Sequence, residues 1–130
     1  MTGDRGQVKE RTPIRSYKDL EVWQEGVQTV KMTYRLTQQF PREELYGLTS
    51  QLRRAVVSIP ANIAEGCARN HRAEYRQFLY VALGSLAEAE TLCCVVVELG
   101  WCSSETVEQQ CGHSLMLLRR KLLALVRRLS

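Results

Sequence analysis

The chain contains few prolines and glycines and no long hydrophobic run. It contains only 3 prolines and 8 glycines in 130 residues, with 45% apolar and 25% charged residues. This composition is typical of one ordinary globular domain. The uncharged apolar run at residues 91–97 is far shorter than the roughly 20 residues that a bilayer requires. We therefore expect no membrane-spanning segment.

The N-terminus lacks the apolar core of a secretory signal. Residues 1–15 mix both charge signs and include only Met1, Val8 and Ile14 as larger apolar residues. They show no helical period, so we interpret them as a mobile arm. The five cysteines are odd in number, and most lie in apolar helical patterns where a free thiol behaves as a small hydrophobe. Both features predict a cytoplasmic protein.

The ligand spacings of common metal and catalytic centres are also missing. Neither histidine, His71 or His113, belongs to a Glu-x-x-His pair, which excludes a carboxylate-bridged di-iron bundle. There is no Cys-x-x-Cys pair and no phosphate-binding glycine loop. Cys67 and His71 could be imagined as a nucleophile and base, but no orienting acid accompanies them. We therefore predict no metal, no cofactor and no catalytic residue.

Four segments after residue 15 carry apolar residues alternately three and four positions apart, the period of one helix face. They run from Leu20 to Tyr34, Leu45 to Ile63, Tyr75 to Val96 and Cys111 to Leu129. The expected helices span about 22 to 29 residues each, and the connections are short. This pattern predicts an all-α, antiparallel up-down-up-down four-helix bundle over residues 16–130. In the first segment the predicted core stripe comprises Leu20, Trp23, Val27, Val30 and Tyr34.

Capping residues predict the helix ends. The expected N-caps are Ser16, Asn70 and Ser103, and the expected C-terminal caps are Gly66 and Gly100. They place the turns between the four helices.

Two residues break the rules for a helix interior. Pro60 removes an amide donor and clashes with the carbonyl of Val56. Because the apolar positions from Leu52 to Ile63 stay in phase across it, we favour one kinked helix, with a new helix capped by Ser58 as the alternative. Gly84 lies in the middle of the third segment, where glycine costs about 1 kcal/mol relative to alanine. Such a glycine usually permits close backbone approach, either within the bundle or across a subunit contact.

The same segments contain long and unusual sequence motifs. The chain reads YKDLEVWQ at residues 17–24, FPREELYGLTSQLRRAVVSIPANIAEG at 40–66 and EYRQFLYVALGSLAEAETL at 74–92. These motifs resemble those of the four-helix bundle proteins encoded in 23S ribosomal RNA intervening sequences. The resemblance implies assembly into a ring, typically a homopentamer, and kinship with basic retroelement accessory proteins that bind RNA and a reverse transcriptase. It implies no known enzymatic activity.

A polar line runs beside the apolar seam of the second segment. Its members recur at spacings of three, four, four and three, and they are Gln51, Arg54, Ser58, Asn62 and Glu65. We interpret the line as structural: its groups would bond one another, satisfy backbone groups freed by Pro60, and reach Ser85 or Glu88. The alternative is a catalytic cleft, which no nucleophile or metal ligand joins.

Basic residues form two clusters. The last segment has five positive charges and no acid within ten residues, at Arg119, Arg120, Lys121, Arg127 and Arg128. The second cluster comprises Arg69, Arg72 and Arg76. A protomer of net charge +4 gives a five-subunit ring about +20, enough for appreciable phosphate neutralisation. We therefore predict a non-enzymatic ring that binds RNA or DNA, with a purely protein-binding architectural ring as the alternative.

Assembly is also expected from apolar residues outside the main stripe of the third segment. They are Leu79, Val81, Val95 and Val97. A helix that is apolar on more than one face needs a second partner. Together with the family resemblance, these residues predict a cyclic homo-oligomer of five subunits.

Overall fold

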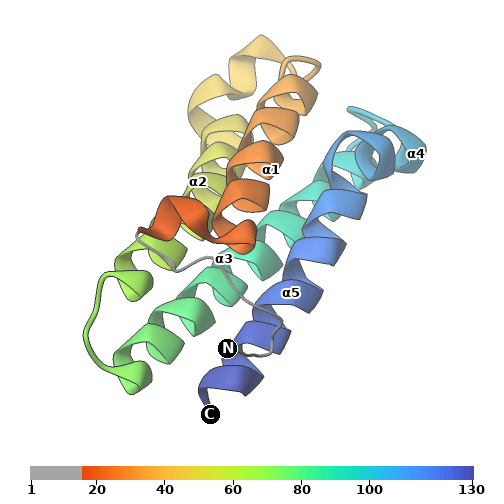
Figure 1. Ribbon diagram of the computed structural model, residues 1–130. Coiled ribbons are helices and arrows are strands. Elements are labelled where there is room, and N and C mark those ends of the chain that lie inside the picture. Colours follow the sequence, from red (N-terminus) through yellow and green to blue (C-terminus); the bar gives the residue numbers. More distant parts are fainter. Residues whose placement is uncertain (1–15) are drawn as a thin grey trace.

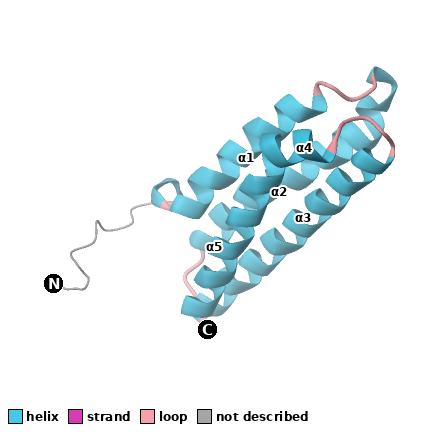
Figure 2. Ribbon diagram, turned by 90° about the vertical axis from the view of Figure 1, so that its right-hand side faces the viewer, coloured by secondary structure: helices cyan, strands magenta, loops and turns pink. Residues whose placement is uncertain are grey.

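The computed structural model describes residues 16–130, and in this range it is helical with no strand. The long helices α1 (Glu21–Thr37), α2 (Ser50–Cys67) and α3 (Arg72–Glu98) are followed by α4 (Ser104–Val107), which continues through a π-turn, η4 (Glu108–Gly112), into α5 (His113–Leu129). Figures 1 and 2 show these segments packed side by side with short connections. The predicted four-helix bundle is confirmed. The predicted N-terminal arm, residues 1–15, lies outside the described residues.

Three short turns complete the chain. The 3₁₀ turns are η1 (Tyr17–Asp19) and η2 (Arg42–Glu44), and η3 (Leu45–Thr49) is a π-turn that leads directly into α2. Ser16 and Asp19 form a capping box around η1. The cap predicted at Ser16 is therefore present, but it closes the short turn before α1 and not α1 itself.

The turn between α3 and α4 has the capping predicted from the sequence. Gly100 adopts a left-handed conformation with φ of 80°. The amide of Trp101 donates to the carbonyl of Val96 and that of Gly100 to Val97, both at 3.0 Å. These two bonds are the Schellman arrangement that a C-terminal glycine permits. Ser103 then accepts from the amide of Thr106 at 3.1 Å and caps α4.

The turn between α2 and α3 differs from the prediction. Gly66 does not end α2, because the helix continues to Cys67. A Cβ at Gly66 would lie 2.8 Å from Cβ of Phe78 and 3.1 Å from the Tyr75 carbonyl oxygen. This glycine is therefore present for close approach of α3. The N-cap of α3 is His71, not Asn70, and it caps without a side-chain hydrogen bond.

The core-facing side of α1 matches the predicted stripe only in part, because Leu20, Trp23 and Val30 pack against the core but Val27 and Tyr34 do not. Its buried residues are Val22, Gly26, Thr29, Thr33, Leu36 and Thr37. Val27 and Tyr34, which the period placed inside, are 37% and 39% exposed. The Thr33 hydroxyl donates to the Thr29 carbonyl at 2.7 Å, and the Thr29 hydroxyl donates to the Glu25 carbonyl at 2.9 Å. Because the helix itself satisfies these hydroxyls, threonines can replace aliphatic residues in the core.

Pro60 lies inside one continuous helix, so the interpretation of a single α2 is correct and the two-helix alternative is wrong. Its ring is buried against α1, where a Cβ at Gly26 would lie 3.2 Å from the Pro60 Cβ. Glycine on one helix thus faces proline on the other. This contact brings α1 and α2 close together.

The third helix is more apolar than its packing requires. Within residues 16–130, α3 is long and apolar enough to cross a membrane by length and composition alone, with 33% of its most apolar stretch buried. Isolated glutamates, Glu88 and Glu90, interrupt the apolar sequence of α3, so the helix contains no long uncharged run. A core helix of a bundle meets the same criterion, and α3 packs on α2 and α5. Of the residues expected outside its main stripe, Leu79 is fully buried and Val97 packs against the core, so that expectation is wrong for these two, whereas Val81 and the adjacent Tyr80 are exposed.

Candidate nucleic-acid interface

The fold brings the cluster at Arg69, Arg72 and Arg76 to the same end of the molecule as Arg127 and Arg128. The guanidinium of Arg76, early in α3, donates to the carbonyl of Leu129 at 2.8 Å. This bond joins the first turns of α3 to the last turn of α5, as Figure 1 shows for the ends of the two helices. Arg128 also lies close enough to Tyr75 to act on its hydroxyl electrostatically. We call this region the basic end; it comprises Arg69, Arg72, Arg76, Arg127 and Arg128.

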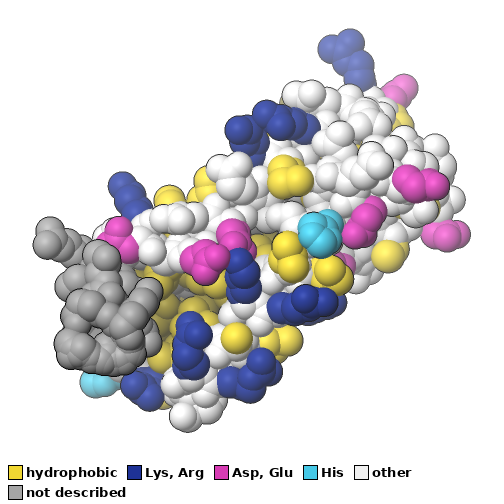
Figure 3. Space-filling model, turned by 45° about the vertical axis from the view of Figure 1, so that its right-hand side comes forward, with side chains coloured by type: hydrophobic (Ala, Val, Ile, Leu, Met, Phe, Trp, Pro, Cys, Tyr) yellow, Lys and Arg dark blue, Asp and Glu magenta, His cyan; other side chains and the backbone are white. Residues whose placement is uncertain are grey.

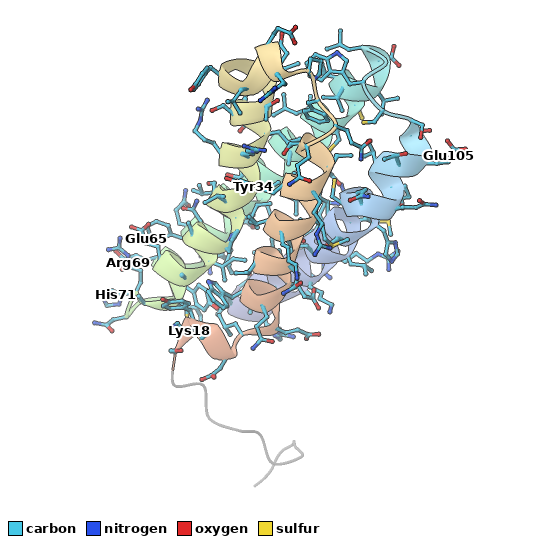
Figure 4. All side chains as sticks on the ribbon, turned by 90° about the horizontal axis from the view of Figure 1, so that it is seen from above. Lys18, Tyr34, Glu65, Arg69, His71 and Glu105 are labelled. Atoms are coloured by element: carbon cyan, nitrogen blue, oxygen red, sulfur yellow. The ribbon has the colours of Figure 1, made fainter. Side chains whose placement is uncertain are left out.

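Two arginines of the basic end have partners within the protein. Arg76 is held by the Leu129 carbonyl. Arg69 pairs with Glu65 at 3.1 Å, and its guanidinium lies 4.8 Å from the centre of the Phe78 ring. Figure 4 shows Glu65, Arg69 and His71 at this end of the ribbon.

Three exposed arginines of the basic end remain available. Arg72, Arg127 and Arg128 are exposed, and no acidic residue among residues 16–130 pairs with them. Arg120, two helical turns before Arg127, is likewise exposed and unpaired within that range. These guanidinium groups can donate hydrogen bonds to phosphate oxygens without first breaking an ion pair.

Two of the residues predicted to bind phosphate already form ion pairs with carboxylates. Arg119 donates to both carboxylate oxygens of Glu90, at 2.8 and 3.0 Å. Lys121 pairs with Glu21 at 2.8 Å and with Glu25. Hydrogen bonds to these carboxylates raise the pKa of Lys121, and the bond from Lys121 lowers the pKa of Glu21. Figure 3 shows basic and acidic side chains side by side on this face.

These ion pairs correct the sequence interpretation of α5. Carboxylates from α1 and α3 neutralise two of its five basic residues, Arg119 and Lys121. Arg119 and Lys121 therefore bridge α5 to its neighbours, and the free positive charge is concentrated toward the basic end.

The polar line of α2 joins this helix to α3. The hydroxyls of Ser58 and Ser85 are 2.8 Å apart, and the Gln51 amide donates to Glu88 at 3.4 Å. The Asn62 amide donates to both the carbonyl and the hydroxyl of Ser58, at 2.8 and 2.9 Å. The line is therefore a set of contacts at the edge of the α2–α3 interface.

Other expectations about the polar line are not met. Asn62 reaches the carbonyl of Ser58, whereas the carbonyl that Pro60 deprives of its donor is that of Val56. Arg54 donates to Ser50 at 2.7 Å, and Glu65 pairs with Arg69. The catalytic alternative required Arg54, Asn62 and Glu65 to act together, and these contacts direct them to different partners.

Two of the described thiols belong to the core. Cys93 and Cys111 are buried with their Sγ atoms 3.8 Å apart. The bond with Cys111 and burial raise the pKa of Cys93, and burial raises the pKa of Cys67. A protonated thiol is a weak nucleophile. Within residues 16–130 no three histidine, cysteine or acidic residues are grouped to hold a metal ion.

A groove that the sequence did not indicate lies at the junction of α1, η3 and α2. Its volume is about 590 Å³, and it is lined by Tyr34, Leu45, Tyr46, Ser50, Arg53, Arg54, Val57 and Ser58. The sequence period had assigned Tyr34 and Leu45 to the core, whereas both are more than one-third exposed. A signal was present in the sequence, because the adjacent arginines Arg53 and Arg54 follow Tyr46 within a few positions.

These observations define a four-helix bundle protein. The sequence profile of the family described as 23S rRNA-intervening sequence protein matches residues 18–119. The chain belongs to this family, because the match covers most of its length. The matched range includes Arg69, Arg72 and Arg76, and it ends before Arg127 and Arg128. No curated protein matches the chain significantly.

Proposed function

We propose that the protein is a non-enzymatic binding protein that engages structured RNA through its basic end. The observation that carries the proposal is the convergence of Arg72, Arg127 and Arg128, without acidic partners among the described residues, from two regions far apart in the chain. Unpaired guanidinium groups bind phosphate oxygens and release counterions. The family's link to 23S ribosomal RNA supports RNA as the nucleic acid.

The proposal includes assembly into a homo-oligomeric ring, with five subunits expected from the family resemblance. Its support is the outward face of α3, where Tyr80 and Val81 are 50% and 45% exposed. No heavy atom lies within 4 Å of a Cβ built at Gly84 on the same helix. A neighbouring subunit on this face would bury its apolar side chains. A ring would also repeat the basic end, which multiplies the charge presented to one RNA.

The test measures binding of a labelled RNA hairpin to the full chain over a range of salt concentrations. The variant Arg127→Gln/Arg128→Gln should weaken binding and lower the slope of log K against log salt by about 1.4 to 1.8, or about 0.7 to 0.9 for each lost phosphate contact. The matched control, Arg119→Gln/Lys121→Gln, removes the same charge from the same helix. Because those side chains bind carboxylates, the control should keep the wild-type slope.

Equal salt slopes in the two variants would contradict a role for the basic end. The exposed α3 face favours one second candidate, an architectural ring whose partner is another protein. That candidate predicts an oligomer by light scattering and no RNA binding even at low salt. A single-chain mass at micromolar concentration would contradict assembly in both cases.

A further inference from the structure

The groove lies where α1, η3 and α2 meet. Figure 1 shows the segment before α2 at the opposite end of the bundle from the start of α3 and the end of α5, which form the basic end. The groove volume of about 590 Å³ falls within the roughly 300–1,000 Å³ typical of small-ligand sites. No acidic residue lines it, whereas two arginines and two tyrosines do. The groove therefore combines positive charge with aromatic surface, separately from the site proposed above.

Tyr46 is the most exposed aromatic residue in the groove. It belongs to η3 and is 94% exposed, so its ring contributes almost nothing to the core. The preceding acid, Glu44, is turned back toward the chain and accepts from the amide of Leu48 at 3.4 Å. The Tyr46 ring is thus open to a flat partner.

A second flat surface is built from Tyr34 and Arg53. The Arg53 guanidinium lies 4.6 Å from the centre of the Tyr34 ring, and its Nε donates to the Thr37 hydroxyl at 3.0 Å. The hydroxyl and the ring hold the guanidinium in place without neutralising it. Such a platform can stack on a nucleobase through both its ring and its guanidinium plane.

Arg54 supplies a further uncompensated charge. Its Nη1 donates to the Ser50 hydroxyl at 2.7 Å, which positions the side chain but leaves its charge unpaired. Both arginines of the groove therefore have neutral partners, in contrast to Arg119 and Lys121 on α5. An anion entering the groove meets no carboxylate among the lining residues.

We propose that this groove binds a single-stranded RNA segment, with bases stacked on Tyr46 and on the Tyr34–Arg53 platform and a phosphate held by Arg54. Single strands are recognised by this combination of aromatic stacking and positive charge, because their base faces are free whereas those of a duplex are covered. The inference rests on the proposed function and extends it: the basic end holds structured RNA, and the groove holds an unpaired segment.

The test uses the full chain and two labelled probes, an oligouridylate of about ten nucleotides and an RNA hairpin without unpaired ends. Tyr46→Ala should weaken oligouridylate binding by about 5- to 150-fold and leave its salt slope unchanged, because stacking releases no counterions. Arg54→Gln should lower that slope by about 0.7. Neither change should affect hairpin binding. Leu123→Ala, which removes an exposed side chain from α5 outside both sites, is the control and should leave the binding of both probes unaffected.

Several outcomes would overturn the proposal. They are no oligouridylate binding by the wild type, wild-type affinity in Tyr46→Ala, and Tyr46-dependent binding of poly-glutamate in place of RNA, which would assign the groove to an acidic protein segment. Circular dichroism verifies that the Tyr46→Ala chain is folded, as expected for a side chain that is 94% exposed. Failure of the proposed function is recognised separately, because it appears as unchanged hairpin binding in Arg127→Gln/Arg128→Gln.

Discussion

Two helical glycines, Gly66 and Gly84, lie on opposite sides of α3 and differ in their surroundings. On the inner face, Gly66 of α2 lies so close to α3 that an added Cβ would be 2.8 Å from the Cβ of Phe78. On the outer face, a Cβ at Gly84 would have no heavy atom within 4 Å. Both glycines lie inside helices, where the residue is intrinsically unfavourable. A helical glycine therefore indicates close packing only where a neighbouring element is actually present.

The largest effect is expected at the inner face. Gly66→Ala should lower the free energy of unfolding by roughly 1–3 kcal/mol, because the backbone of α3 at Tyr75 and the Cβ of Phe78 must move to admit the methyl group. Urea denaturation of the full chain measures this change. An increase in stability, as in an ordinary helix, would show that α2 and α3 are not in close contact here.

A smaller effect of opposite sign is expected at the outer face. Gly84→Ala should raise the stability of the protomer by up to about 1 kcal/mol, because alanine is the better helix former and the space is open. If a neighbouring subunit packs closely against Gly84, the same change should weaken the oligomer measured by light scattering. A gain in stability with unaltered assembly would place the subunit contact elsewhere.

The smallest effect at neutral pH is expected for Tyr75→Phe, next to Gly66. The Tyr75 hydroxyl is buried without a hydrogen-bond partner, so removing it should change stability by less than about 1 kcal/mol. Burial, followed by the nearby Cys67 thiol, raises the pKa of Tyr75 from 10.0 to about 12. The folded state thus holds this proton more tightly than the unfolded state does.

The pH dependence follows from the direction of that shift. The contribution of Tyr75 to stability is complete below pH 10 and is lost as the pH rises toward 12. Tyr75→Phe should therefore reduce the loss of stability over this alkaline range, measured by urea denaturation at several pH values. The same alkaline slope in both proteins would mean that Tyr75 is solvated in the folded state.

Local patterns in the sequence determined the helices and several of their ends. The three- and four-residue period located the long segments, and in α2 it passed through Pro60 without interruption, as the structure does. Gly100 and Ser103 marked the turn before α4, because a left-handed residue and an N-cap depend only on residues a few positions away. The all-α class and the family were readable from the same local signals.

Only the tertiary structure decided which faces and charges remain free. The threonines of α1 could enter the core because their hydroxyls bond within the helix, and the period of apolar residues does not register such satisfied polar groups. Lys121 pairs with Glu21, which lies 100 positions away in the chain, and Arg119 pairs with Glu90, which lies 29 positions away. Arg127 and Arg128 pair with no acidic residue among the described residues. Composition and spacing determined where positive charges lie along α5, whereas neutralisation depends on distance in space, which the packing of α1 and α3 against α5 sets.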